Sequence, residues 1–393
     1  MEVRKGYKQT EVGIIPEDWD VKALGELGEF KNGINKGKED FGFGHPFVNL
    51  MDVFGIPKIS DSSNFGLINS TDVDRKMYEL KKGDVLFVRS SVKPVGVGLT
   101  TLIAEDLPDT VFSGFLIRFR NKDDIAHEFK EHCFYDFRFR NRLIANSTVS
   151  ANTNINQDAL KALLFAFPKS KDEQQAIAAA LSDVDALLNS LDALIAKKRL
   201  IKQGAMQELL TGKKRLPGFS GEWEVKRIGQ VLKLRYGKSQ NGVVVTDGKY
   251  PIIGTGGEVG RTNHYLYDRP SIIIGRKGTI DDPKYIDTPF WTIDTAFYSE
   301  VSDNTNPKFL FYKFCTFNWY LYNEASGVPS LNATTVESVE ISIPPSLAEQ
   351  TAIAEILSDM DAEISALEQK REKTRLLKQG MMQELLTGRI RLL

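Results

Sequence analysis

The chain has 393 residues, of which 41% are hydrophobic and 26% charged, a composition typical of a globular protein with two or three domains. No apolar run is long enough to span a membrane and the first residues lead into no signal core, so we expect a cytoplasmic protein without a membrane partner. The formal net charge of −1 excludes nucleic-acid binding through a bulk basic excess, and leaves local positive charge or phosphate contacts shared with a partner.

The first half opens with a predicted strand at 18–22 and continues as short strands and turns. Buried strands are predicted at 84–88 and within 111–119, because both are apolar runs rich in β-formers. A basic turn follows the first run and contains Arg89, Ser90, Ser91 and Lys93. Arginine can pair with guanine, lysine reaches base acceptors or phosphate, and serine donates to either, so these four residues are candidate DNA contacts. The alternative is an ordinary solvated turn.

A long helix is predicted for 169–212. It begins after Pro168, which ends a strand, and stops near Gly212, where glycine can adopt the left-handed conformation. Its apolar residues recur in alternating steps of four and three, the pattern of a coiled-coil seam, at Ile177, Leu181, Val184, Leu188 and Leu191. The internal Gly204 suggests close packing, a kink or a short break.

The second half repeats this helix. Residues 173–212 return 176 positions later as 349–388, with roughly two dozen of the forty positions identical. The repeated seam consists of Ile353, Leu357, Met360, Ile364 and Leu367. Two matching seams most simply pack on each other as helices of roughly 57 Å. The alternative is that each stripe faces its own globular domain.

The repeat also includes the opening strand, which recurs at 222–226, and a return strand before each helix, whereas the regions between them differ. In the second half a buried strand is predicted at 271–274 and an aromatic-rich helical segment at 307–322. A second basic turn adds Arg276, Lys277 and Thr279 as candidate DNA contacts. Ser330 and Asn332, in a polar stretch whose counterpart is 147–156, could contact adenine or cap the following structure.

The chain carries no convincing catalytic motif. The glycines of 254–260 lack the spacing of a dinucleotide-binding loop and suggest a tight turn, and 275–279 lacks the frame of an ATP-binding loop. The spacing of His127, His132 and Cys133 matches no standard metal motif, and Cys133 and Cys315 are expected to be buried thiols. We therefore expect no metal, no cofactor and no catalytic residue in this chain.

The repeated motifs resemble the specificity subunit of Type I restriction-modification systems. The resemblance rests on 344–361 and 376–388, and on their first-half equivalents 173–185 and 200–212. It covers essentially the full length. Pro168 is followed by Lys169 where the second half has Pro344 and Pro345, which leaves the start of the first helix less sharply defined.

The resemblance implies an α+β fold with an internal pseudo-two-fold repeat, in which two target-recognition domains are joined by two long antiparallel coiled-coil helices. The implied domains are 1–168 and 213–345, with spacer helices at 169–212 and 346–393. Each domain would read one half of a bipartite double-stranded DNA target. The helices would set the spacer and dock two methylation subunits.

By the same resemblance, S-adenosylmethionine, ATP and magnesium belong to partner subunits of a methyltransferase and endonuclease complex, which can include two restriction subunits. The chain itself is expected to be non-catalytic. An alternative function is a structural adaptor that holds two identical protein partners without contacting DNA. A stand-alone DNA-modifying enzyme would need a cofactor site that the sequence does not contain.

Overall fold

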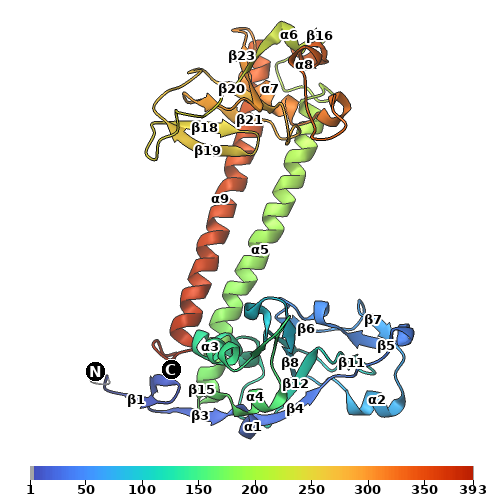
Figure 1. Cartoon of the computed structure of the whole chain (residues 1–393), viewed down its shortest axis with the longest axis vertical. Coiled ribbons are helices and arrows are strands. Elements are labelled where there is room, and N and C mark those ends of the chain that lie inside the picture. The colour runs from blue at the N-terminus through green and yellow to red at the C-terminus, as the bar shows by residue number, and fades with distance from the viewer. Residues whose placement is uncertain (1–3, 393) are drawn as a thin grey trace. The chain divides into compact units, whose positions relative to one another are not determined.

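The computed structural model describes residues 4–392, which form two compact units. The first unit contains residues 4–190 and 371–392, and the second contains residues 191–370. Both units combine helices with small, mostly antiparallel sheets, in agreement with the predicted α+β class (Figure 1). Among the described residues, no helix combines the length and the hydropathy that a membrane crossing requires.

The first unit is built around a five-stranded sheet and several smaller ones. In spatial order the large sheet consists of β4 (Gly28–Asn32), β12 (Leu116–Asn121), β8 (Val85–Val88), β10 (Thr100–Ile103) and β6 (Lys58–Ile59). The three-stranded sheets are β11 (Val111–Phe112), β5 (Phe41–Val48) and β7 (Gly66–Ile68), and β13 (Thr148–Val149), β14 (Thr153–Asn154) and β9 (Ser90–Ser91). The two-stranded sheets are β1 (Tyr7–Thr10) with β2 (Gly13–Pro16), and β3 (Trp19–Ala23) with β15 (Leu164–Pro168).

The central strand β8 explains why this sheet forms the core. All four of its residues are buried, as the apolar run predicted, because both faces of the strand are covered. Phe87 from β8 and Phe119 from β12 contact each other and the ring of Phe134. The short helices of this unit are α1 (Leu24–Leu27), α2 (Asp72–Met77), α3 (Phe137–Ala145) and α4 (Gln157–Ala162).

The second unit has a similar arrangement of elements. Its larger sheet consists of β17 (Leu232–Tyr236), β23 (Ala296–Val301), β20 (Ser271–Gly275) and β21 (Lys284–Ile286). The smaller sheets are β19 (Gly257–Thr262), β18 (Tyr250–Gly254) and β22 (Trp291–Thr292), and β16 (Glu224–Arg227) with β24 (Glu340–Ile343). Its short helices are α6 (Ile228–Val231), α7 (Pro307–Phe314) and α8 (Ala333–Ser338). The expected tight turn joins β18 to β19: Gly254 and Gly257 pair across it, Gly256 lies within it, and Gly260 belongs to β19.

The opening and return strands predicted in each half pair with each other. Strand β3 is antiparallel to β15, and β16 is antiparallel to β24. In both units the return strand therefore leads from the small sheet directly into a long helix. The variable regions lie between the two paired strands, so their sequences can differ while the base of each domain is kept.

The two long helices are α5 (Lys171–Leu209) and α9 (Leu347–Leu385), each of 39 residues. A glutamine attaches the first turn of each helix to its domain. Gln174 accepts a hydrogen bond from the Ala126 N–H at 2.6 Å and donates one to the Pro168 carbonyl at 2.7 Å. Gln350 does the same with Asn306 at 2.8 Å and Pro344 at 2.9 Å. The repeated glutamine thus satisfies polar groups at the junction of strand and helix.

Both helices end near a glycine in the left-handed conformation, as predicted. The φ angles are +71° at Gly212 and +69° at Gly388. A Cβ atom at Gly388 would also lie 2.6 Å from Pro16, so this position requires glycine for two reasons. The internal Gly204 and Gly380 lie within continuous helix. Among residues 4–392, no atom lies within 4 Å of a Cβ built at either position, so packing inside this part of the chain does not require these glycines.

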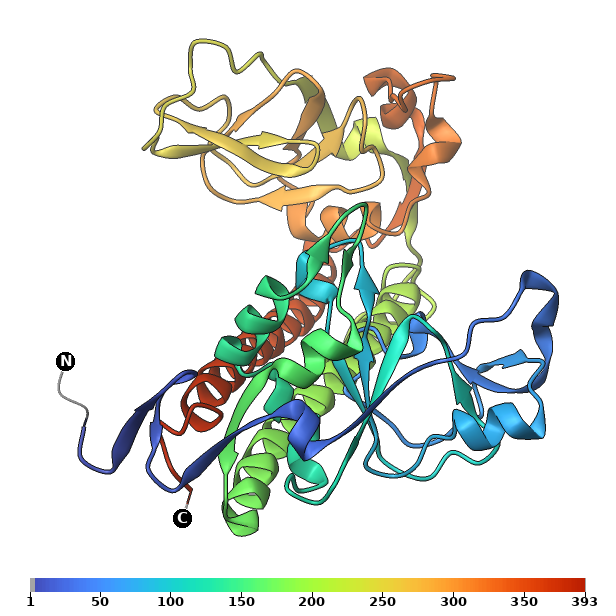
Figure 2. The same ribbon diagram turned by 60° about the horizontal axis from the view of Figure 1, so that its bottom comes forward.

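The end of the chain completes the first unit. Tyr7, from the β1–β2 hairpin, donates a hydrogen bond to the Gly388 carbonyl at 2.9 Å, and the hairpin lies beside the end of α9 (Figure 2). Beyond it, Arg391 forms ion pairs with Glu173 at 2.5 Å and with Asp18 at 2.7 Å. Residues 388 and 391 are therefore attached to the first folded core.

Candidate nucleic-acid interface

The first basic turn and the polar segment at 147–156 meet in one small sheet. Ser90 and Ser91 form β9, which pairs with Asn154 and Thr153 of β14. Strand β14 pairs in turn with β13. The sheet joins segments about sixty residues apart in the sequence, and it presents Lys93 at the protein surface.

The backbone around Arg89 places this residue at the junction of three segments. Its N–H donates to the Phe115 carbonyl and its own carbonyl accepts from the Ile155 N–H. The guanidinium donates to the Gly114 carbonyl at 3.2 Å. Ser91 is buried, whereas Ser90 is half-buried and Lys93 is exposed. Of these four predicted contacts, Lys93 is therefore the most accessible to a ligand and Ser91 the least.

The second unit brings its two predicted segments together in the same manner. Lys277 and Ser330 form an antiparallel bridge. The Arg276 carbonyl accepts from the Leu331 N–H, as the Arg89 carbonyl accepts from Ile155. The guanidinium of Arg276 donates to the Asp294 carbonyl at 3.0 Å and lies over the ring of Tyr236, with Cζ 5.3 Å from the ring centroid. Lys277 and Thr279 are exposed and Ser330 is half-buried.

Asn332 caps a helix. Its side-chain oxygen accepts a hydrogen bond from the Thr334 N–H at 3.0 Å at the start of α8, and Asn156 similarly accepts from Ala159 at 2.8 Å at the start of α4. Of the two roles considered for the Asn332 side chain, its oxygen serves the capping role. Asn332 remains exposed beside the second basic turn.

The predicted helix seam divides into two parts. Ile177, Leu181, Ile353 and Leu357 are buried in the cores of the globular domains, which is the alternative considered for the stripe. Further along the helices, Leu191 and Ile364 are also buried, while Val184, Leu188, Met360 and Leu367 are half-buried. The first turns of each seam thus attach the helix to its own domain.

Ion pairs connect the facing helix segments within each unit. In the second unit α5 and α9 run in opposite directions, because Arg199 pairs with Glu368 at 2.5 Å and Lys202 pairs with Asp361 at 2.5 Å. In the first unit Lys378 pairs with Asp185 at 2.6 Å. Asp185 and Lys378 are the repeat equivalents of Asp361 and Lys202, so the duplicated sequence makes the same contact in both units.

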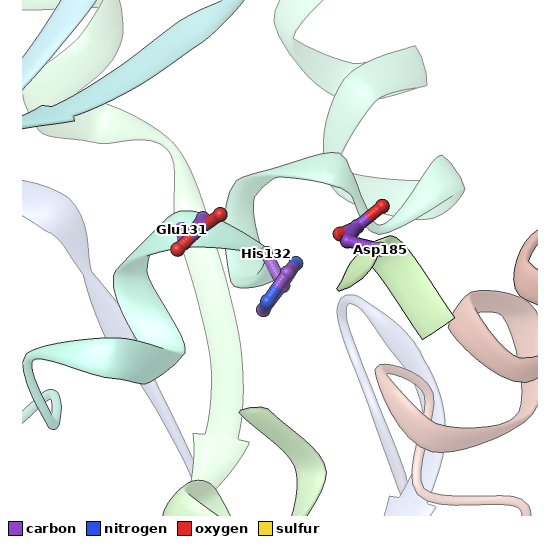
Figure 3. Close-up of side chains that lie close together, drawn as sticks. All are labelled: Glu131, His132 and Asp185. Atoms are coloured by element: carbon purple, nitrogen blue, oxygen red, sulfur yellow. The ribbon is translucent and has the colours of Figure 1, made fainter. Parts of the chain in front are cut away.

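The structure contains one group of metal-ligating side chains among its described residues. Candidate ligand atoms of Glu131, His132 and Asp185 lie within 4.8 Å of one another (Figure 3). Both carboxylates are already neutralised, since Lys58 lies 3.4 Å from Glu131 and Lys378 lies 2.6 Å from Asp185. His132 contacts the Ser182 hydroxyl at 3.1 Å, and burial lowers the pKa of the imidazole. A cation would have to displace two ammonium groups, so we assign these residues to the attachment of α5.

Three features of the structure were not predicted from the sequence. The apolar side chains of Met51, Val95 and Phe115 lie beside the first basic turn and are 77%, 68% and 56% exposed. Arg391 and its repeat equivalent Arg215 each bind a buried glutamate at the start of a long helix. The repeat continues past Gly212 and Gly388 as far as these arginines, so the matching positions of Arg215 and Arg391 could have been recognised in the sequence. Cys315 is exposed, contrary to expectation, because it lies at the C-terminal end of α7.

An aliphatic pair at 200–201 and its repeat equivalent at 376–377 form a further accessible feature. Leu200 and Ile201 are 69% and 47% exposed on α5, and Leu376 and Leu377 are 52% and 59% exposed on α9. The same apolar positions are therefore accessible to solvent in both copies of the helix.

The structure thus places two globular units with matched basic turns, each attached to a long helix, in one chain. The family model for the Type I restriction modification DNA specificity domain matches residues 16–199 and 220–377. The chain therefore belongs to the Type I restriction-modification specificity family.

Curated relatives agree with this assignment. A Methanocaldococcus jannaschii protein provisionally named the MjaX specificity subunit of a type I restriction enzyme is 27% identical and aligns over 98% of this chain and 97% of its own length. The MjaVIII specificity subunit of the same organism is 22% identical over 98% of this chain and 96% of its own length.

Solved structures agree in fold. The S subunit of a Type I restriction-modification system from M. genitalium has a TM-score of 0.62 at 15% identity, and each chain is covered over 98%. The HsdS subunit from Thermoanaerobacter tengcongensis has a TM-score of 0.51 at 16% identity, with 96% of this chain and 98% of that chain covered.

Proposed function

We propose that this chain selects the DNA sequence for a Type I restriction-modification complex, and that each globular unit reads one half of a bipartite target. The observation that carries the proposal is the matched placement of Arg89 and Arg276. Each follows a central strand, and each accepts a backbone hydrogen bond from the residue before a capped helix. Basic turns of this kind can reach base edges and phosphates in the major groove. Their different neighbours supply two different recognition surfaces.

The proposal is tested by co-expressing the chain with methylation subunits and mapping methylated adenines at single-base resolution. We expect a split motif with a fixed spacer. Exchange of residues 34–150 for the corresponding region of another family member should change one half of the motif only. A change in both halves, or a continuous motif, would contradict the modular assignment.

Charge removal distinguishes DNA recognition from the adaptor alternative. Lys93→Ser should weaken methylation through the first half-site and Lys277→Ser through the second, because both lysines are exposed beside their turns. Lys122→Ser is the matched control, since Lys122 is exposed elsewhere on the first unit. If the chain is an adaptor, the complex should keep its partners and its methylated sequence in all three variants.

The long helices are proposed to form an antiparallel coiled coil that acts as a ruler between half-sites. The matched ion pairs of Asp185 with Lys378 and of Asp361 with Lys202 support a pseudo-two-fold arrangement. Insertion of four residues near Leu191 and four near Arg371 adds about one helical turn to both helices. We expect a longer spacer in the methylated motif; an unchanged spacer would refute the ruler.

The aliphatic pairs Leu200–Ile201 and Leu376–Leu377 are proposed to dock one methylation subunit each. A variant with glutamate at 200 and 201 should bind one methylation subunit instead of two, and a variant with glutamate at all four positions should bind none. Leu194→Glu is the control, because Leu194 is 38% exposed on α5 but its repeat equivalent is Lys370. Two subunits bound to the fourfold variant, measured by native mass spectrometry, would exclude this surface.

The chain is proposed to act without catalysis of its own. S-adenosylmethionine, ATP and magnesium are assigned to the methylation and restriction subunits. Isothermal titration of the purified chain with S-adenosylmethionine checks this division, and binding to the chain alone would contradict it.

A further inference from the structure

An apolar groove lies beside the first basic turn. This apolar groove is defined here by five of its lining side chains: Met51, Phe54, Val92, Val95 and Phe115. The groove has a volume of about 630 Å³, and Val92 at its edge is 80% exposed. Contiguous exposed apolar surface of this kind marks an interaction site, because it is costly to leave in contact with water.

The charge beside the apolar groove is positive at one lining residue. Lys93 is the charged residue among those that line the groove, and none of the lining residues that the structure describes is acidic. Arg140 donates a hydrogen bond to the Val95 carbonyl at 2.9 Å, and Arg89 donates to the Gly114 carbonyl, next to Phe115. Both arginines are half-buried, and each binds the backbone of a residue that lines the groove or adjoins one that does. An apolar surface that carries one lysine, has two arginines nearby and lacks an acidic lining residue is complementary to a polyanion that also presents an apolar group.

Double-stranded DNA has these properties. Its major groove presents the C5-methyl group of thymine beside the hydrogen-bonding edges of the bases, with phosphates on either side. We propose that the apolar groove is the subsite where the first unit recognises a pyrimidine C5-methyl group. This inference rests on the function proposed above. Val92 extends from the turn that carries the candidate base contacts, so methyl contact and hydrogen bonding would occur at neighbouring positions.

The test compares thymine with uracil in the mapped target, because uracil lacks only the methyl group. In the assembled methylation complex, uracil at the contacted position of the first half-site should lower the methylation rate at subsaturating DNA about fourfold, the value expected for one buried methyl group. Replacement of cytosine by 5-methylcytosine at that position, which restores the methyl group on another base, should recover part of the rate lost with unmodified cytosine.

The variants locate the effect in the apolar groove. In a Met51→Ala/Val92→Ala variant the rates with thymine and uracil should become equal, whereas uracil in the second half-site should act as in the wild type. Both side chains are largely exposed, so their truncation leaves the core intact. The matched control is Met77→Ala/Val73→Ala, whose side chains are 46% and 66% exposed on α2. The control should retain the fourfold ratio.

Several outcomes overturn the inference. Equal rates with thymine and uracil at every position of the first half-site would do so, as would a wild-type ratio in the Met51→Ala/Val92→Ala variant. Loss of the methylation subunit from that variant would identify the apolar groove as a protein interface. These results leave a split, methylated motif in place, whereas the absence of any such motif would refute the proposed function and this inference with it.

Discussion

Replacement of Arg391 by glutamine is expected to destabilise the first unit although the residue is the third from the end of the chain. The guanidinium binds Glu173 through two nitrogens, at 2.5 and 2.8 Å, and Asp18 at 2.7 Å. The Glu173 side chain is only 2% exposed, and its other described hydrogen bond comes from the Trp19 indole at 3.3 Å. Removal of the arginine therefore leaves a buried carboxylate without its cation.

The magnitude follows from this burial. Removing one partner of a fully buried pair costs about 3–5 kcal/mol. Arg391 is 18% exposed, so water can partly replace it, and we expect a loss of about 2–3 kcal/mol in the free energy of unfolding of the first unit. The contact of Arg391 with the exposed Asp18 contributes little to this figure.

The assay is urea unfolding combined with hydrogen exchange of β3, β15 and the first turns of α5. Arg375→Gln serves as the control, because Arg375 and Glu372 form an ion pair in which both side chains are more than half exposed, and its loss should leave the first unit unchanged. The double variant Arg391→Gln/Glu173→Gln should recover part of the stability, since it removes the unpaired charge. Wild-type stability of Arg391→Gln, or no recovery in the double variant, would refute the reasoning.

Three further predictions concern stability. Burial lowers the pKa of His132, which faces Glu131, Asp185, Lys58 and Lys378. As the pH falls through about 6.5, the imidazole therefore takes up its proton in the unfolded chain before it does so in the folded one. The first unit should lose stability there more steeply than a His132→Gln variant. Burial lowers the pKa of Lys313 to about 8. The second unit should therefore gain stability between pH 8 and 10, because the unfolded chain still holds this proton there. The Lys313→Met variant should lose that gain, and an unchanged pH profile in the variant would contradict the assignment. Gly380→Ala should stabilise α9 by about 0.5–1 kcal/mol in thermal unfolding, whereas Gly388→Ala should destabilise the first unit because of its positive φ and its contact with Pro16.

Features set by local sequence patterns were predicted, whereas contacts between distant segments were not. The buried strands after 84 and 271, the two long helices and their glycine ends follow from patterns within short windows, and all of them are present in the structure. The seam is a more instructive case. Its a/d spacing predicts an apolar stripe correctly, but the spacing does not say which surface covers the stripe, and Ile177 and Leu181 pack into the first domain.

The duplication and the two basic turns were determined by the sequence alone, because each is encoded in local composition or in direct similarity between the halves, whereas the class of fold came from the resemblance to a known family. Only the tertiary structure decided which segments meet. Strand register joins β9 to β14 and brings Lys277 to Ser330, and the fold gathers Met51, Val92 and Phe115 into one groove. Arg391 reaches Glu173, which lies 218 positions earlier in the sequence. These contacts depend on chain reversals and side-chain burial far apart in the sequence, where no short pattern specifies the partner.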